Sequence, residues 1–287
     1  MSSRLSFTKG HGTRNDFVLI DDRSGAAPLT ATLAARLADR RAGIGGDGVI
    51  RVVRTADAAD AQIRALADEA EWFMDYRNAD GSIAEMCGNG VRVFAAYLRR
   101  EELAPASGFA VATRSGVKPV RFEGDDVVVG MGRWRPVDEQ EAADGMDALV
   151  HVPGQSPFSA LRLDLGNPHT VAAVPPAVDL ASLDLTAAPA VNPHPTEGTN
   201  VEFVQPLGPG KLRMRVYERG VGETESCGTG VCAAAVATHL WAGGLDRDEP
   251  WTVEVPGGRL RVRMLPGSEV ELAGPAVLVA DGTISLD

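Results

Sequence analysis

Cysteine is scarce in this sequence, with three residues among 287. So few cysteines cannot form the dense disulfide framework that stabilises small secreted domains. Basic residues are also in deficit, because 28 Lys and Arg face 39 Asp and Glu, for a formal net charge of −11 at pH 7. A nucleic-acid or anionic-membrane surface needs clustered Lys and Arg. The composition therefore favours a small-molecule substrate, with no nucleic-acid partner and no membrane partner.

Long apolar runs are missing as well. No stretch approaches the roughly 20 apolar residues that span a bilayer, and no basic segment followed by an apolar one opens the chain. We therefore expect a cytoplasmic location, where an odd number of cysteines indicates thiols that react or are buried. With 44% hydrophobic residues the chain can bury one large core or two ordinary ones, and two domains fit this length best.

Glycine is concentrated around two of the three cysteines, in AEMCGNGVR (84–92) and TESCGTGVC (224–232). At an offset of 140 residues, six of eleven positions are identical: Glu85, Cys87, Gly88, Gly90, Val91 and Ala95 match Glu225, Cys227, Gly228, Gly230, Val231 and Ala235. Asn78 and Glu218 also correspond, each nine residues before its cysteine. A period this long indicates a duplicated domain and not a solenoid of short repeats.

Each cysteine motif leads into a helical pattern, VRVFAAYLRREELA in the first half and VCAAAVATHLWAGG in the second. Both cysteines are therefore predicted to lie at helix N-termini. Alternating segments on either side predict strands, with Asn15 and Asn167 in the connecting turns and Asn200 in a turn that enters a strand. The acidic, Pro-containing piece at 135–147 is predicted to be a linker or surface loop between the halves.

This duplication predicts a chemistry. A helix N-terminus offers unpaired backbone N–H groups and the positive end of a dipole, which bind carboxylates and make a thiol more acidic. If a pseudo-twofold axis relates the two domains, the motifs face each other and hold one α-carboxylate, with one sulfur on each side of the α-carbon. A thiolate could then abstract the α-proton while the opposite thiol donates one, without a metal or other cofactor.

The sequence resembles the diaminopimelate epimerase family. The resemblance rests on FTKGHGTRNDFV, YRNADGS, CGNG, GNPHTV, GTNVEF and ERGVGETESCGTG, which together cover nearly the whole chain. It implies an α/β (α+β) fold of two pseudo-symmetric domains, each a mixed sheet curled around a central helix. The expected domains are residues 1–132, completed by a C-terminal strand at 275–287, and residues 133–274.

The resemblance also implies an activity and a site. The activity is the cofactor-independent conversion of LL-diaminopimelate to meso-diaminopimelate in lysine and peptidoglycan biosynthesis, by an enzyme that is commonly a homodimer. Cys87 and Cys227 match the alternating base and acid, and His169 and Glu218 match positions that tune the thiols. The matched substrate-binding positions are Asn15, Asn78, Gly88, Asn89, Asn167, Asn200, Glu218, Arg219, Gly228 and Thr229. Some family members carry Gln where this chain has Gly48, so no contact is assigned there.

The polar residues fit a substrate with two amino acid ends. Arg219, with Asn78 and Asn200, could supply a planar fork and amide donors for a carboxylate, and Glu218 could pair with an ammonium group. Each residue also has a plainer interpretation. The asparagines are typical turn residues, the Glu218 and Arg219 pair could be solvated, and His169 could be structural. Cys232 is best interpreted as a small buried apolar residue.

Three other functions remain open on the sequence alone. Proline racemases and hydroxyproline epimerases share the two-cysteine chemistry, but their first motif has His where Asn89 stands here. A thiol redox or metal-binding protein is disfavoured because no C-x-x-C pair is present. An isomerase of the same fold that uses a carboxylate in place of thiols is disfavoured because both cysteines are present.

Overall fold

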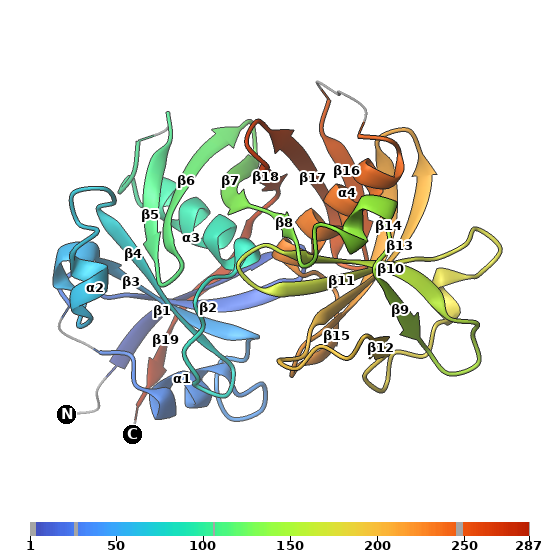
Figure 1. Cartoon of the computed structure of the whole chain (residues 1–287). Helices are drawn as coiled ribbons and strands as arrows, with labels where there is room; N and C mark the ends of the chain where they lie inside the picture. Colours follow the sequence, from blue (N-terminus) through green and yellow to red (C-terminus); the bar gives the residue numbers. More distant parts are fainter. Residues whose placement is uncertain (1–3, 26–27, 106, 245–248, 287) are drawn as a thin grey trace. The chain divides into compact units, whose positions relative to one another are not determined.

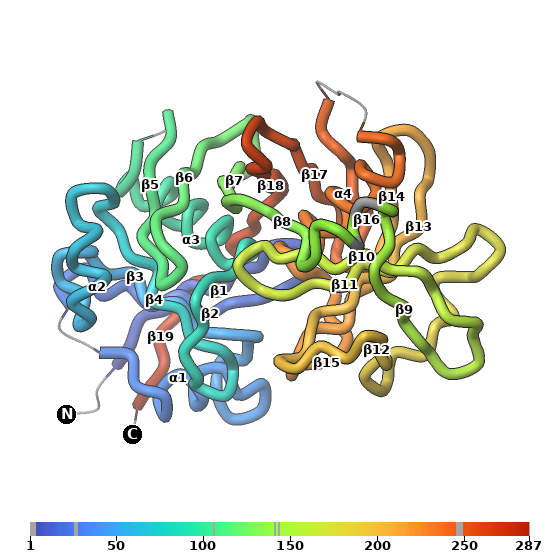
Figure 2. Tube along the Cα trace, viewed as in Figure 1, coloured from blue at the N-terminus to red at the C-terminus, as the bar shows by residue number. Residues whose placement is uncertain are grey.

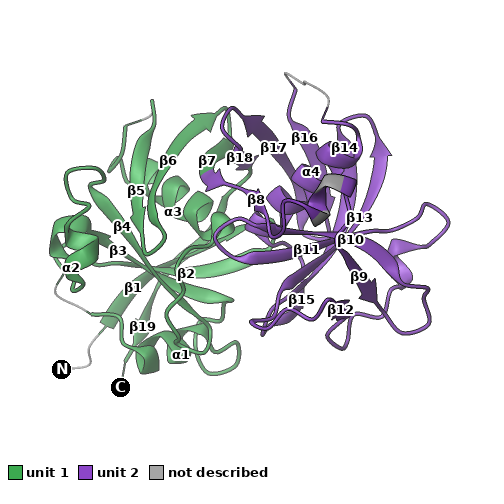
Figure 3. Ribbon diagram, in the orientation of Figure 1, with its two compact units in different colours: residues 1–130, 274–287 green, residues 131–273 purple. Residues whose placement is uncertain are grey.

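The computed structural model describes residues 4–25, 28–105, 107–244 and 249–286. The chain divides into two compact units, residues 1–130 with 274–287 and residues 131–273 (Figure 3). Each unit combines a mixed sheet with one long helix, which confirms the expected α+β class. Residues 1–3 and 287 of the first expected domain lie outside the described residues.

The strands of the first unit are β1 (Arg4–Gly12), β2 (Asn15–Asp21), β3 (Gly48–Arg54), β4 (Trp72–Asn78), β5 (Phe109–Thr113), β6 (Gly116–Glu123), β7 (Asp126–Arg133) and β19 (Val277–Ser285). Its helices are α1 (Ala31–Ala38), α2 (Ala61–Arg64), α3 (Gly88–Arg100) and the 3-10 turn η1 (Thr55–Asp57). Hydrogen-bonded neighbours follow the order β19, β1, β2, β3, β4, β5, β6, β7, and only the β2/β3 and β4/β5 pairs in this series are parallel. The trace in Figure 2 shows β19, from the end of the chain, running beside β1.

The strands of the second unit are β8 (Arg135–Pro136), β9 (Ala148–His151), β10 (Phe158–Asp164), β11 (Pro168–Ala173), β12 (Ala190–Asn192), β13 (Asn200–Gly208), β14 (Lys211–Glu218), β15 (Gly222–Thr224), β16 (Trp251–Val255), β17 (Gly258–Leu265) and β18 (Glu269–Gly274). Its helices are α4 (Gly228–Trp241) and the 3-10 turns η2 (Glu141–Asp144) and η3 (Leu180–Ser182). The main series of neighbours is β9, β10, β11, β13, β14, β16, β17, β18, with β11/β13 and β14/β16 parallel.

The two units therefore share one strand topology. Starting from β1 in the first unit and β10 in the second, the successive pairs are antiparallel, parallel, antiparallel and parallel. The long helix follows the fourth of these strands, β4 or β14, along the chain. The parallel registers correspond too, because Phe17 pairs with Gly48 in β2/β3 and His169 pairs with Asn200 in β11/β13. Positions in one unit can thus be compared with their equivalents in the other.

The long helices occupy the centre of each unit. In Figure 1 the strands of each unit curl around its helix, and α3 contacts β1, β2, β3, β4 and β19 while α4 contacts β10, β11, β13, β14, β16 and β17. The sequence of α4, GTGVCAAAVATHLW, is apolar on nearly all sides, as expected for a fully enclosed helix. Cys232 lies within it with 0% exposure, as its plainer interpretation predicted.

Of the two predictions for 135–147, the surface loop agrees with the largely irregular, partly exposed backbone, and the linker between the halves is wrong. Its residues belong to the second unit, because β8 pairs antiparallel with β10 and the Trp241 indole N–H donates to the Gly145 carbonyl at 2.6 Å. Prolines and acids at a sequence boundary indicate irregular backbone, which this segment has, but they do not show that it is detached. Within the described ranges, no helix combines the length and apolar character needed to cross a membrane.

Candidate active site

Cys87 is the N-cap residue of α3. Its backbone is extended (φ −142°, ψ 117°), and its carbonyl accepts the Val91 N–H at 2.8 Å. The Gly90 N–H donates to the Cys87 sulfur at 3.5 Å. Gly88, the first helical residue, is buried. The helix therefore presents its positive end at the thiol, as the sequence predicted.

Asn15 and Asn89 lie against this thiol. Asn15 is the first residue of β2, directly after a tight turn at Thr13 and Arg14 with φ of 49° and 64°. The Cys87 thiol donates to Asn15 Oδ1 at 3.5 Å, and Asn89 Nδ2 donates to the same oxygen at 3.1 Å. We call Asn15, Cys87 and Asn89 the Cys87 cluster.

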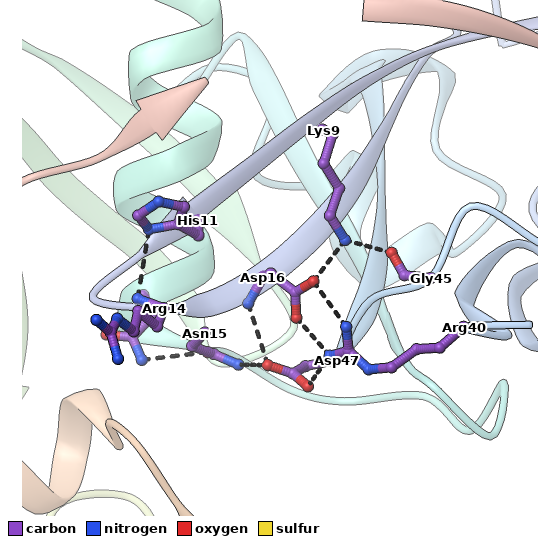
Figure 4. A network of polar contacts seen from close by, with 9 residues as sticks. Lys9, His11, Arg14, Asn15, Asp16, Arg40, Gly45 and Asp47 are labelled. Carbon is purple, nitrogen blue, oxygen red and sulfur yellow. Dashed lines mark hydrogen bonds and ion pairs between the residues drawn. The ribbon is translucent and has the colours of Figure 1, made fainter. Parts of the chain in front are cut away.

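A charged network holds the other end of the Asn15 amide (Figure 4). Asn15 Nδ2 donates to Asp47 Oδ2 at 2.7 Å, and the Asp16 N–H donates to the same oxygen at 3.1 Å. Arg40 Nη2 lies 2.8 Å from Asp47 and 2.6 Å from Asp16, and Lys9 reaches Asp16 at 2.5 Å. Burial alone would raise the pKa of Asp16, but hydrogen bonds from Arg40 and Lys9 lower it to about 2. The Asn15 oxygen is thereby fixed toward Cys87.

Gly48 has a packing role in this unit. A Cβ built at this position would lie 2.4 Å from the Tyr76 ring and 2.6 Å from the Arg77 carbonyl oxygen. Separations below 3.0 Å are essentially never seen for a real Cβ. Any side chain at this position would therefore require both the Tyr76 ring and the Arg77 backbone to be placed differently.

Cys227 is the corresponding N-cap residue of α4. Its backbone has φ −115° and ψ 116°, its carbonyl accepts the Val231 N–H at 2.9 Å, and Gly228 is buried at the first helical position. Thr229 Oγ1 lies 3.6 Å from the Cys227 sulfur. Cys227 is 7% exposed, whereas Cys87 is only partly buried.

His169 and Glu202 form a buried pair in the same unit. His169 Nδ1 lies 2.7 Å from Glu202 Oε1, and both side chains are 0% exposed. The second ring nitrogen, His169 Nε2, lies 3.0 Å from Asn167 Oδ1, and Asn167 Nδ2 donates to Thr229 Oγ1 at 3.3 Å. A chain of contacts thus runs from Glu202 to the first turn of α4.

Glu218 adds a second carboxylate beside Cys227. Burial, followed by the negative charges of Glu218 and Glu202, raises the pKa of Cys227 well above its ordinary range. Burial and the charge of Glu202 also raise the pKa of Glu218, although hydrogen bonds with Thr224 and Cys227 act in the opposite direction. The Cys227 thiol is therefore protonated at neutral pH. We call this group the Cys227 cluster: Asn167, His169, Glu202, Glu218, Cys227 and Thr229.

Three other predicted residues hold loops in this structure. Asn78 closes the turn after β4, because its Nδ2 donates to Ser82 Oγ at 3.0 Å. Asn200 Nδ2 donates to the Pro168 carbonyl and its Oδ1 accepts the Arg219 N–H, each at 3.0 Å. The exposed Arg219 side chain donates to the Glu197 carbonyl at 2.9 Å. These contacts match the plainer turn interpretation of both asparagines, and their binding of substrate stays a prediction.

Comparison with known proteins decides between the families weighed above. The sequence profile described as diaminopimelate epimerase matches residues 7–137 and 162–279. The diaminopimelate epimerase of Streptomyces coelicolor is 50% identical over 98% of this chain and 96% of its own length. That of Thermobifida fusca is 47% identical over 98% of both chains. The chain belongs to the diaminopimelate epimerase family.

Solved structures share the fold of this family member at low sequence identity. A phenazine biosynthesis protein of the PhzF family from Bacillus anthracis matches with a TM-score of 0.64 at 15% identity, over 99% of this chain and all of that one. A hydroxyproline epimerase from Agrobacterium vitis gives 0.64 at 13% identity, over 100% and 94%. These likenesses show the fold alone, and so do not favour the proline racemase alternative over the family shown by sequence.

In this diaminopimelate epimerase family member, Glu202 belongs to the Cys227 cluster and Asp47 contacts the Cys87 cluster, but neither was among the residues predicted from sequence. Glu202 left a signal, since it is the one polar residue in VEFV, a buried part of β13. Asp47 stands between glycines in GGDG, where nothing in the neighbouring sequence indicates a role. Across the described ranges, no group of three or more His, Cys, Asp or Glu side chains is arranged to hold a metal ion.

Proposed function

We propose that this chain is a cofactor-independent isomerase that converts LL-diaminopimelate to meso-diaminopimelate, with Cys87 and Cys227 as the two acid–base groups. The observation that carries the proposal is that two cysteines, in the same motif and at equivalent points of one repeated topology, are each the N-cap of a buried helix. A single-cysteine mechanism gives no reason for this duplication.

The helix N-termini are proposed to bind the α-carboxylate of the substrate. The first turn of a helix leaves backbone N–H groups without intrahelical partners, and these groups and the dipole favour an anion. In the Cys87 cluster the Asn89 amide lies at the same helix end. The charge that develops on the carboxylate when the α-proton leaves would be stabilised by these donors, which raises the acidity of the α-carbon.

Proton transfer then uses one thiol on each face of the α-carbon. Because Cys227 carries its proton at neutral pH, it can act as the acid in the direction in which Cys87 is the base. In the reverse direction Cys227 must lose its proton. Glu218 is hydrogen-bonded to it and has a raised pKa, so it is a stronger base than an exposed carboxylate and can accept that proton.

The second amino acid end of the substrate would be recognised by Arg219, with Asn78 and Asn200 as amide donors, whereas Glu218, beside Cys227, would pair with an ammonium group. The Arg219 side chain is exposed and donates to the Glu197 carbonyl oxygen, a bond that it can exchange for one to a carboxylate. Loss of the distal end would leave these groups unpaired, which can discriminate by about 10⁴-fold.

Several finer features belong to the same proposal. The two folding domains are proposed to be residues 1–132 with 275–287 and residues 133–274. The enzyme is proposed to be a cytoplasmic homodimer that acts in lysine biosynthesis.

One assay tests the proposal. The protein is incubated with LL-diaminopimelate in deuterated water, and meso product and α-deuterium are followed together. We expect inversion with one solvent deuteron at the inverted carbon. L-proline and trans-4-hydroxy-L-proline serve as comparison substrates. Absence of both exchange and meso product from diaminopimelate, or equal turnover of proline, would refute the proposed substrate.

A further inference from the structure

Glu202 is the most deeply buried acid of the Cys227 cluster. Its side chain is 0% exposed, and among the described residues it is hydrogen-bonded to His169 Nδ1, 2.7 Å from Oε1. Among the described residues, Glu202 Oε2 has no hydrogen-bond partner. A buried carboxylate is costly unless it is neutralised or paired with a positive charge. The pair must therefore contain a proton between Glu202 and His169.

A second proton follows from the other ring nitrogen. His169 Nε2 lies 3.0 Å from Asn167 Oδ1, while Asn167 Nδ2 donates to Thr229 Oγ1 at 3.3 Å. An amide oxygen only accepts hydrogen bonds, so Nε2 must donate in this arrangement. The His169–Glu202 pair then holds two protons, one shared with the carboxylate and one facing Asn167.

The chain makes room for this carboxylate next to the thiol. A Cβ at Gly230 would lie 2.6 Å from Glu202 Oε1 and 3.3 Å from the Cys227 Cβ. At the equivalent Gly90, a Cβ would meet Ile50 at 3.4 Å and Phe17 at 3.6 Å, both ordinary apolar contacts or close to them. In the β2/β3 and β11/β13 registers, Phe17 and Ile50 are the equivalents of His169 and Glu202.

The fold itself therefore does not require the polar pair, because the first unit builds the same topology on apolar side chains. We infer that Glu202 is a positioning residue, which keeps protons on both nitrogens of His169 and so fixes the Asn167 amide with its NH₂ group toward the first turn of α4. The relevance of this orientation to catalysis rests on the proposed function, in which Asn167 binds substrate.

Replacement of the carboxylate by an amide predicts a defined rearrangement. In Glu202→Gln the negative charge is lost, so His169 becomes neutral and one of its two nitrogens loses its proton. If the introduced amide oxygen accepts from Nδ1–H, His169 Nε2 carries a lone pair, and the Asn167 amide would turn to donate to it. The Asn167 NH₂ group would no longer donate to Thr229. The α4 end of the site would thereby lose one hydrogen-bond donor.

Nitrogen NMR of the full chain tests the proton count directly. Histidine is labelled with ¹⁵N, and the His169 signals are identified by their disappearance in His169→Gln. Without substrate, the wild type should show both His169 nitrogens bonded to hydrogen, and Glu202→Gln should show one unprotonated nitrogen. An unprotonated Nε2 in the wild type overturns the inference, even if no Glu202 variant folds. This result does not depend on which substrate the enzyme uses.

Kinetics then test the positioning role. We expect Glu202→Gln to lower kcat for diaminopimelate by about 100-fold, the usual cost of a misplaced site group, and Glu202→Asp to recover part of the loss. Asp147→Asn is the matched control, since Asp147 is also 0% exposed and pairs with Arg162 at 3.0 Å in the same unit. Full kcat in folded Glu202→Gln, or equal losses in Asp147→Asn, would refute the role. Failure of wild type to turn over diaminopimelate would refute the proposed function and leave the NMR result standing.

Discussion

The two units share one topology, but different kinds of side chain pack against the first turn of the long helix in each. Beside Gly90 the first unit packs Phe17 and Ile50, whereas beside Gly230 the second unit buries the carboxylate of Glu202. The asparagines also present opposite ends. Asn15 turns its oxygen toward Cys87, and Asn167 turns its NH₂ group toward Thr229. Duplication has preserved the position of each thiol, while the surroundings of the two thiols have become chemically distinct.

This difference suits the proposed reaction, in which a proton leaves one face of the α-carbon and another is added to the opposite face. An enzyme that works in both directions needs one protonated and one deprotonated thiol, and identical surroundings would give both thiols the same protonation preference. The buried acids of the second unit favour the protonated form of Cys227. These acids therefore favour a protonated Cys227 before substrate arrives.

The largest expected effect comes from removing either thiol. Cys87→Ala and Cys227→Ala should each abolish inversion, because each thiol serves one face of the α-carbon. Cys232→Ala is the control and should retain activity, since Cys232 is 0% exposed within α4. Activity is measured as meso product formed from LL-diaminopimelate. Wild-type turnover in either of the first two variants would exclude the two-base mechanism.

A graft of the apolar pair gives the next largest effect. The double variant His169→Phe with Glu202→Ile copies Phe17 and Ile50 into the second unit. Exchange of a buried ion pair for apolar side chains is often neutral for stability, so the variant should fold. Epimerisation should nevertheless fall by about 100-fold or more, because the support of Asn167 is lost.

Thermal unfolding and turnover are measured on the same preparation of the graft variant. Ile50→Val is the control for a small packing change beneath the other helix, and it should keep most of the activity. A folded graft variant with normal turnover would mean that the chemical difference between the units is incidental to catalysis.

A smaller effect is expected from the network behind Asn15. In Asp47→Asn, an amide replaces the carboxylate that accepts Asn15 Nδ2, so the Asn15 amide loses its fixed orientation. We expect kcat/KM to fall by about 10-fold, within the usual range for groups that orient a site residue. Asp164→Asn, which likewise replaces a carboxylate by an amide, at the acceptor of the Gly166 N–H in the corresponding turn of the second unit, is the matched control. Equal kcat/KM values for Asp47→Asn and Asp164→Asn would show that Asp47 has a structural role only.

Sequence was sufficient for features that are encoded locally. A cysteine before glycine and an apolar run signals a helix start, and both N-caps lie where the motifs indicated. Glu202 and Asp47 could not be assigned roles, because these depend on the β11/β13 and β2/β3 registers, which join distant segments. The residues at 135–147 show the same limit, because their composition indicates a loop but cannot show that β8 pairs with β10.

The smallest expected effect is on stability, and its sign should differ between the units. The pKa of Asp16 is lowered to about 2 from 3.8, so its contribution is present above pH 3.8 and is lost as pH falls through about 2. The pKa of Glu218 is raised above 4.5, so the stability linked to its protonated form is present below pH 4.5 and is lost as pH rises through the folded-state pKa.

Asp16→Asn should therefore lower the Tm at pH 7 and matter less near pH 2. Glu218→Gln should raise the Tm at pH 7, with a gain that shrinks below pH 4.5. Differential scanning calorimetry of both variants and wild type across this range measures the differences. A loss of Tm in both variants at pH 7 would contradict the opposite signs, and would show that Glu218 is stabilised in its charged form by its partners.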